Sequence, residues 1–144
     1  MVEPGGGEPG GGWSMAAMLE AAATSVPITV DLVLGTGVAG LYVDPGVAGA
    51  VAFLVGEGLR NTWRHSGAEA AAVRVDRVGA GELRVEVSDD GVGFLPDEAA
   101  GAGLVRVDRR LRDVGSVLAI DSRPWCGTRL VAVVPIVPVA PKRV

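Results

Sequence analysis

The sequence predicts an α+β fold, a two-layer sandwich in which a mixed β-sheet is covered on one face by helices. Three observations predict it. Segments in which apolar residues recur with a period of two alternate with segments of helical period. Two pairs of the expected strands are joined by short turns, which favours hairpins. The 144 residues are 49% hydrophobic and only 4% aromatic, which favours one core of mostly Val, Leu and Ala.

Composition divides the chain into three parts. Residues 1–14 are rich in Gly and Pro, which is typical of a flexible linker. Residues 15–135 contain the periodic segments, and we expect them to form one domain. Residues 136–144 form a Pro-containing tail that we do not expect to pair in a sheet.

The expected elements follow from periodicity and from their boundary residues. The Asp44-Pro45 pair suits a helix start, with Asp as the N-cap and Pro at the first helical position, and Gly67 suits the end of that helix. The turn at Gly79-Ala80-Gly81 joins two strands into a hairpin. In order, we expect a helix within 13–23, a strand at 24–34, a helix at 46–65, strands at 73–78 and 83–87, a helix at 104–114, and strands at 117–121 and 128–134.

A carboxylate stands at the end of a core-facing row. The strand at 83–87 alternates apolar and polar residues, and the same period places Asp89 on the apolar side. A carboxylate in that position needs a hydrogen-bonding partner. The glycines that follow, Gly91 and Gly93, let backbone approach a ligand closely. We therefore expect a ligand to be the partner of Asp89.

Polar side chains form a stripe on the otherwise apolar helix at 46–65. Glu57 and Asn61 are four residues apart and share a face, His65 continues it, and Arg64 lies next to it. Two interpretations stay open at this point. The stripe is either a solvated helix face or a site where carboxylate and amide oxygens hold Mg²⁺ and water, with Arg64 or His65 near phosphate.

Two glycine segments are weak signals when taken alone. Gly101-Ala102-Gly103-Leu104 opens a helix, and free N–H groups at a helix N-terminus suit a polyphosphate. The segment is not a dinucleotide fingerprint because position 106 is Arg, and no Gly-Lys-Ser/Thr of a Walker loop occurs in the chain. Gly127-Thr128 is by itself a turn followed by a β-branched strand residue.

Composition argues against several other classes. The net charge of −4 gives no support for a nucleic-acid partner. The single cysteine, Cys126, excludes an internal disulfide, and its place in an expected turn after Trp125 argues against a catalytic thiol. The longest uncharged apolar stretch, 45–56, is shorter than the roughly 20 residues needed to span a bilayer, and we recognise no signal peptide. We therefore expect a cytoplasmic protein.

Taken together and in this order, four segments resemble the nucleotide-binding domain of histidine kinases, in the superfamily that includes DNA gyrase and MutL. The segment from 109 to 130 is especially similar to the nitrate-sensor and DesK-like sensor kinases. The resemblance covers roughly residues 19–135 and implies the Bergerat-type ATP-binding fold. The four segments are 57–61 followed by Arg64-His65, which resembles the N box, 89–94 and 101–104, which resemble the two glycine boxes, and 127–130, which resembles the terminal Gly-Thr element.

The resemblance implies ATP and Mg²⁺ as ligands and a role for each matching residue. Asp89 would accept a hydrogen bond from the adenine amino group, with Thr128 beside it. Asn61 would coordinate Mg²⁺, and Glu57 would act as a base or orient water. Phosphoryl transfer would then depend on positioning and on neutralisation by the metal. Further nucleotide contacts are implied for Arg64, His65, Gly91, Gly93, Gly101, Gly103 and Leu104.

A sensor kinase of this family also needs dimerisation helices that carry a phosphorylated His. His65 is the only His in this sequence and lies in the segment that resembles the N box. The resemblance therefore implies a catalytic domain that works with a dimerisation or phosphoacceptor protein and with a response regulator. Two alternatives stay open: a stand-alone serine kinase of the anti-sigma-factor type, and a catalytically silent nucleotide-binding interaction module.

Overall fold

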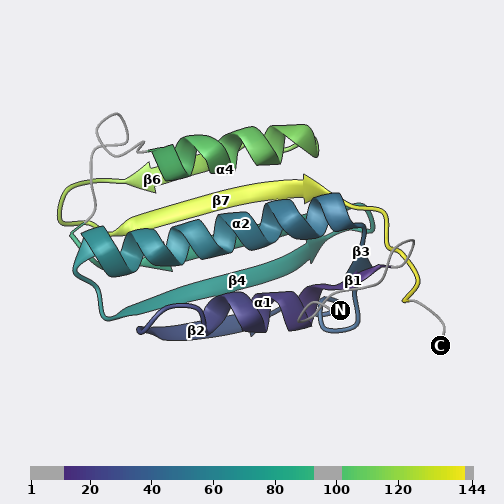
Figure 1. Ribbon diagram of the computed structural model, residues 1–144, viewed down its shortest axis with the longest axis horizontal. Helices are drawn as coiled ribbons and strands as arrows, with labels where there is room; N and C mark the ends of the chain where they lie inside the picture. The colour runs from purple at the N-terminus through teal and green to yellow at the C-terminus, as the bar shows by residue number, and fades with distance from the viewer. Residues whose placement is uncertain (1–11, 93–101, 142–144) are drawn as a thin grey trace.

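The computed structural model describes residues 12–92 and 102–141, which contain a five-stranded mixed sheet with helices on one face (Figure 1). The strand order is β2-β4-β5-β7-β6. β2 and β4 are parallel, and the other neighbouring strands are antiparallel. This architecture confirms the predicted fold class. The strands are β2 (Thr29–Leu34), β4 (Ala70–Val78), β5 (Glu82–Asp89), β6 (Ala119–Ser122) and β7 (Thr128–Pro135).

In the described residues three α-helices lie over the sheet, with α2 in the middle (Figure 1). They are α1 (Met15–Ala23), α2 (Pro45–Asn61) and α4 (Ala102–Asp113). None of the helices within the described residues is long and apolar enough to cross a membrane. Helix α2 supplies the crossover that a parallel β2–β4 pair requires.

The start of the central helix agrees with the sequence prediction, but its end differs. The Asp44 side chain caps α2 by accepting hydrogen bonds from the backbone N–H groups of Gly46 and Val47 at 2.9 and 3.1 Å. Beyond α2 the chain continues as a π-helical turn, η1 (Thr62–Ser66). Gly67 ends this turn with a left-handed φ of 70°. The sequence predicted one continuous helix, because its apolar pattern does not distinguish a wide final turn from an α-helical one.

The folded part of the described chain extends beyond the expected domain at both ends. β1 (Trp13–Ser14), which we expected to be linker, pairs with β3 (Tyr42–Val43) in a second, two-stranded sheet. At the other end Ile136 is 5% exposed, and its N–H donates to Gly81 O at 2.9 Å. Strands of two residues are too short to show a periodic pattern, so they could not be predicted from periodicity. Residues 1–11 of the expected linker lie outside the described residues.

The core lies between the helices and the sheet. Alternate residues of β5 are buried, as the period of two predicted: Leu83, Val85 and Val87 are at most 2% exposed. The intervening residues, such as Arg84 and Glu86, lie on the opposite face of the sheet and form an ion pair with an N–O distance of 2.9 Å. The helices contribute fully or nearly fully buried side chains at Leu19, Val51, Leu54, Leu59, Leu104, Val107 and Leu111.

Helix α2 approaches the sheet closely at Gly58. A Cβ atom at Gly58 would lie 3.0 Å from Val87 Cγ1 and 3.2 Å from Leu130 Cδ1, which is tighter than ordinary packing contacts. A Cβ at Gly56 would meet only the end of the flexible Arg60 side chain, at 3.4 Å. Gly58 therefore sets the spacing between α2 and the central strands β5 and β7.

These contacts predict opposite effects for two similar substitutions. Gly56→Ala should stabilise the protein by about 0.5–1 kcal/mol, because Ala lowers the cost of forming a helix and the site has room for its methyl group. Gly58→Ala should be about 1–3 kcal/mol less stable than Gly56→Ala, because its methyl group presses on Val87 and Leu130. Urea unfolding of both variants measures the difference. Equal free energies of unfolding would show that the approach at Gly58 is not constrained.

The end of α4 is connected to the strand that follows it through Asp108. One carboxylate oxygen of Asp108 accepts the backbone N–H of Leu118 at 2.9 Å, and the other accepts Arg112 Nε at 2.8 Å. The bond from the Leu118 backbone and then the bond from Arg112 lower the pKa of Asp108 below its ordinary value. Asp108 therefore holds the segment before β6 against α4.

The lowered pKa predicts how the stability depends on pH. Because the folded-state pKa of Asp108 lies below the unfolded value of about 3.9, its stabilisation is present above that pH and is lost as the pH falls through the folded value. Asp108→Asn should therefore lower the free energy of unfolding at pH 7, and the deficit should shrink below about pH 4. The control is Asp31→Asn on β2. A deficit that is constant from pH 7 to pH 3 would contradict this role.

Candidate functional site

The predicted site residues come from elements that meet at one end of the sheet (Figure 1). Asp89 ends β5, and Thr128 begins β7 directly opposite it in the antiparallel register. Opposed residues of an antiparallel pair point to the same face. That face is the one covered by helices, because Thr128 continues the buried row of Leu130. Asn61, the last residue of α2, lies next to Thr62, which contacts Asp89.

The Asp89 carboxylate is held at both of its oxygens. Oδ2 accepts the Thr62 hydroxyl at 2.7 Å, and Oδ1 accepts the backbone N–H of Gly91 at 2.9 Å. The sequence analysis took a ligand to be the missing partner, and this was wrong insofar as the chain itself supplies two partners. Each oxygen keeps a further lone pair that can accept from a ligand. Ligand binding by Asp89 therefore stays a prediction.

Thr62 is a site residue that the sequence analysis missed. It is the first residue of η1 and is 2% exposed. A signal was present, because Thr62 follows Gly58 and Leu59 at helical spacing and so falls on the buried side of the helix. A hydroxyl on an apolar face indicates a partner in the same way as the carboxylate of Asp89 does.

Thr128 belongs to a short chain of hydroxyl groups. Ser122 Oγ donates to Gly127 O at 3.2 Å, and the hydroxyls of Ser122 and Thr128 lie 2.9 Å apart. Either hydroxyl of the Ser122–Thr128 pair can be the donor. Both side chains are buried, at 5% and 6% exposure. This chain joins the start of β7 to the end of β6.

Glu57 lies against the start of α4. Its Oε1 forms an ion pair with Arg60 Nη2 at 2.6 Å. A Cβ placed on Gly103 would be only 2.6 Å from Glu57 Oε2, so the carboxylate packs on the glycine itself. A carboxylate is favourable near a helix N-terminus because of the helix dipole. The structure therefore brings together Glu57 of the N-box-like segment and Gly103 of the second glycine segment.

The other predicted residues differ in how firmly they are held. Asn61 is half-buried and, in the part of the chain that the structure describes, its amide makes no side-chain hydrogen bond. Arg64 and His65 are exposed on η1, and the Arg64 guanidinium lies 5.8 Å from the centre of the Trp63 ring. Leu104 is a core residue at 5% exposure. The predicted residues Gly93 and Gly101 lie outside the described residues.

The side chains at this end suit a metal that is held mostly by phosphate and water. Among residues 12–92 and 102–141 no group of three or more His, Cys, Asp or Glu could hold a metal ion. Mg²⁺ commonly takes one or two oxygens from the protein and the rest from substrate phosphates and water. The uncommitted amide oxygen of Asn61 fits that pattern as a single protein ligand.

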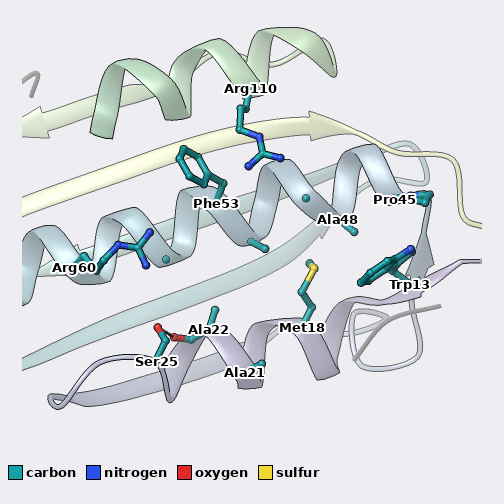
Figure 2. Close-up of a pocket in the computed structure, with 13 residues that line it drawn as sticks. Trp13, Met18, Ala21, Ala22, Ser25, Pro45, Ala48, Phe53, Arg60 and Arg110 are labelled. Atoms are coloured by element: carbon teal, nitrogen blue, oxygen red, sulfur yellow. Dashed lines mark hydrogen bonds between the residues drawn. The ribbon is translucent and has the colours of Figure 1, made fainter. Parts of the chain in front are cut away.

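Two hollows in the described part of the chain differ in their relation to these residues. One, of about 330 Å³, includes Asp89 and Thr128 in its lining. The other, of about 500 Å³, lies on the outer side of the helical layer, where Met18 of α1, Phe53 of α2 and Arg110 of α4 line it (Figure 2). None of the predicted site residues lines this larger groove.

The chain is similar in sequence to a sensor kinase. No family model matches it. An uncharacterized sensor-like histidine kinase of Chloroflexus aurantiacus is 34% identical in an alignment of 117 residues that covers 75% of this chain and 19% of the relative. The chain thus spans about a fifth of the length of that relative.

Solved structures share the architecture. The histidine kinase domain of the blue-light activated histidine kinase from Erythrobacter litoralis superposes with a TM-score of 0.62 at 22% identity, over 85% of this chain and 57% of that one. The mycobacterial sensor histidine kinase MprB gives 0.66 at 19% identity, over 87% and 96%. This chain has the fold of a histidine kinase ATPase domain. Full-length ShkA in complex with AMPPNP gives 0.74 at 17% identity, over 90% and 31%.

In this histidine kinase ATPase fold, the turn before β7 lies against the end of β5. Gly127 has a left-handed φ of 79°, and a Cβ there would overlap the carbonyl oxygen of Asp89. Trp125 in the same turn also has a left-handed φ, of 66°, and its N–H donates to Val92 O. Cys126 is exposed in this turn, as the sequence predicted. Gly127 is thus required for the backbone of Asp89 to lie where it does.

A matched pair of variants separates the close approach from the backbone conformation. Gly67→Ala and Gly127→Ala both place an L side chain at positive φ, which costs about 1–2 kcal/mol. Only Gly127→Ala also overlaps the backbone of Asp89, since no atom lies within 4 Å of a Cβ at Gly67. Gly127→Ala should therefore be less stable than Gly67→Ala by a further 1–3 kcal/mol or so in urea unfolding. Similar losses for the two variants would contradict the contact.

Proposed function

We propose that this chain is the ATP- and Mg²⁺-binding catalytic domain of a two-component sensor histidine kinase. One observation carries the proposal: Asp89 and Thr128 face each other across β5 and β7 at the end of the sheet where α2 ends with Asn61. The shared fold and the 34% identity to a sensor-like histidine kinase support it. The full activity of such a kinase needs segments beyond the fifth of the relative that this chain matches.

The base of the nucleotide would be read by Asp89. Its carboxylate accepts hydrogen bonds from within the chain and has room to accept one more, which suits the exocyclic amino group of adenine. Thr128 lies directly across from it and closes that side of the pocket. The structure of ShkA in complex with AMPPNP, a fold neighbour with a TM-score of 0.74, supports an adenine nucleotide as the ligand.

The phosphates would lie between the end of α2 and the start of α4. The Asn61 amide would supply one oxygen to Mg²⁺, which when bound neutralises phosphate charge. Gly91 and Gly103 leave backbone without side chains near the nucleotide, and the N-terminus of α4 favours anions. Gly93 and Gly101 are proposed as further backbone contacts, Leu104 as an apolar neighbour, and Arg64 and His65 as phosphate neighbours.

Glu57 is the proposed base or water-orienting group. The ion pair to Arg60 and the contact with Gly103 fix its carboxylate beside the start of α4. A group held there can orient an attacking hydroxyl, imidazole or water, so that phosphoryl transfer depends mainly on positioning and electrostatics. The acceptor would be a His of a dimerisation or phosphoacceptor protein, and a response regulator would receive the phosphoryl group next. We propose a cytoplasmic location for this reaction.

Binding of ATP in the presence of Mg²⁺ tests the proposal. Isothermal titration calorimetry should show one site per chain, and Asp89→Asn should weaken binding at least about tenfold, because the amide presents a donor toward the adenine amino group. Asp31→Asn on β2, a control of the same charge change, should bind as the wild type does. If neither the wild type nor the variants bind, or if Asp89→Asn binds as tightly as the wild type, the assignment of Asp89 is wrong.

The nature of the acceptor separates the proposal from its alternatives. With labelled ATP and candidate acceptor proteins, acid-labile phosphate on a His supports the sensor kinase. Acid-stable phosphate on a Ser of an antagonist protein would instead identify a serine kinase of the anti-sigma-factor type. ATP binding without transfer to any acceptor would favour the silent module, which the presence of only one His in the chain keeps open.

A further inference from the structure

We infer that Thr62 is a positioning residue that orients the Asp89 carboxylate and thereby makes the site select a base that donates an amino proton. The inference rests on the proposed function, since it concerns which nucleotide base the site accepts. The helical spacing places Thr62 on the buried side of the helix but does not name its partner. The inference comes from the contact between η1 and the end of β5.

The contact is a strong and specific hydrogen bond. Thr62 Oγ1 lies 2.7 Å from Asp89 Oδ2 and 3.2 Å from Gly58 O. A hydroxyl has one proton to donate, and a bond to a carboxylate oxygen is shorter and stronger than one to a neutral carbonyl. The proton of Thr62 therefore goes to Asp89. Because Thr62 is 2% exposed, water does not compete for it.

The backbone around Thr62 fixes the position of its hydroxyl. Thr62 N–H bonds to Gly58 O and Leu59 O, so the residue continues the turn of α2. One turn earlier, Gly58 lets α2 approach Val87, which is two residues before Asp89 on β5. The same close approach that the core requires thus brings the Thr62 hydroxyl within reach of the carboxylate. As a β-branched residue, Thr also has few side-chain rotamers to lose.

Thr128 is paired with Ser122 rather than with Asp89. It lies directly across from Asp89, but its hydroxyl lies 2.9 Å from that of Ser122. The Asp89 carboxylate is therefore held by one donor on each oxygen, the Thr62 hydroxyl and the Gly91 amide. These donors come from two different segments, η1 and the segment after β5, and bond to different oxygens, so the carboxylate cannot turn freely without losing one of them.

A carboxylate held in this way accepts hydrogen bonds and selects its ligand accordingly. The lone pairs left on its oxygens can accept from an exocyclic amino group such as that of adenine. A base with a carbonyl at the same position, such as guanine, would place that carbonyl against the carboxylate as a second acceptor with no proton between them, which is costly in a partly buried site. Without the Thr62 hydroxyl, the carboxylate can turn or take up water, and the discrimination should weaken.

Two substitutions at position 62 test the inference. Thr62→Val keeps the shape but removes the hydroxyl, and Thr62→Ser keeps the hydroxyl. Calorimetry with Mg-ATP and with Mg-GTP gives the two affinities, and the ratio between them reports base selection. Thr62→Val should weaken ATP binding about 5- to 20-fold and change GTP binding less than about twofold, so that the ratio falls. Thr62→Ser should keep the ratio within about threefold of the wild type.

The possible outcomes separate this inference from the proposed function. A wild type that binds neither nucleotide overturns the proposed function and this inference with it. If the wild type prefers ATP and Thr62→Val leaves the ratio of the two affinities unchanged, only the inference is overturned. An equal loss of affinity for ATP and for GTP in Thr62→Val also overturns only the inference, because it indicates a general structural role. Thermal unfolding shows whether each variant is folded. If Thr62→Val does not fold, the ratio of the ATP and GTP affinities is measured for Thr62→Ala instead.

Discussion

The candidate site depends on the close approach of α2 to β5. Gly58 allows it, because any side chain there would press on Val87. The same approach buries Leu59 and Thr62 against the sheet and places the end of the helix beside the end of the strand. The packing of the core and the geometry of the site therefore depend on the same distance between α2 and β5. A shift of α2 away from Val87 would also separate Thr62 from Asp89. A glycine weakens a helix by up to about 1 kcal/mol, and here that cost is offset by the contact it permits.

At the end of the sheet where β5 ends, polar groups have hydrogen-bond partners mainly within the chain. The hydrogen-bonding capacity that remains determines which ligands can bind. The hydroxyls of Ser122 and Thr128 are bonded to each other, Ser122 also bonds to Gly127 O, and both oxygens of Asp89 have a donor. Asp89 keeps the capacity to accept hydrogen bonds, and the Asn61 amide oxygen keeps the capacity to coordinate a metal ion. A ligand with an amino group at one end and a metal-bridged polyphosphate at the other fits this distribution. A buried polar group that is already oriented needs little rearrangement on binding.

The sequence was sufficient for the sheet, the helices and the residues at the ends of β5 and α2, because periodicity and caps are local information. It was insufficient where the information lies between distant residues. Nothing local indicates that Thr62 meets Asp89, 27 positions later, or that Ser122 orients Thr128. The two-residue pairing of β1 with β3 left no period to recognise. The statement that Asp89 lacks a partner failed for the same reason: the pattern showed a need for hydrogen bonds but not their source.

The measurement that tests the central claim most directly is an amide NMR titration of the wild-type protein with Mg-ATP. The hollow that includes Asp89 and Thr128 and the groove of Figure 2 are lined by different residues, so the shifts distinguish them. If the nucleotide binds where Asp89 and Thr128 face each other, the amides of Gly91 and Thr128 should shift. Those of Gly49 and Ala52, in the groove of Figure 2, should not. Shifts confined to Gly49, Ala52 and their neighbours, with Gly91 and Thr128 unchanged at saturation, would contradict the account.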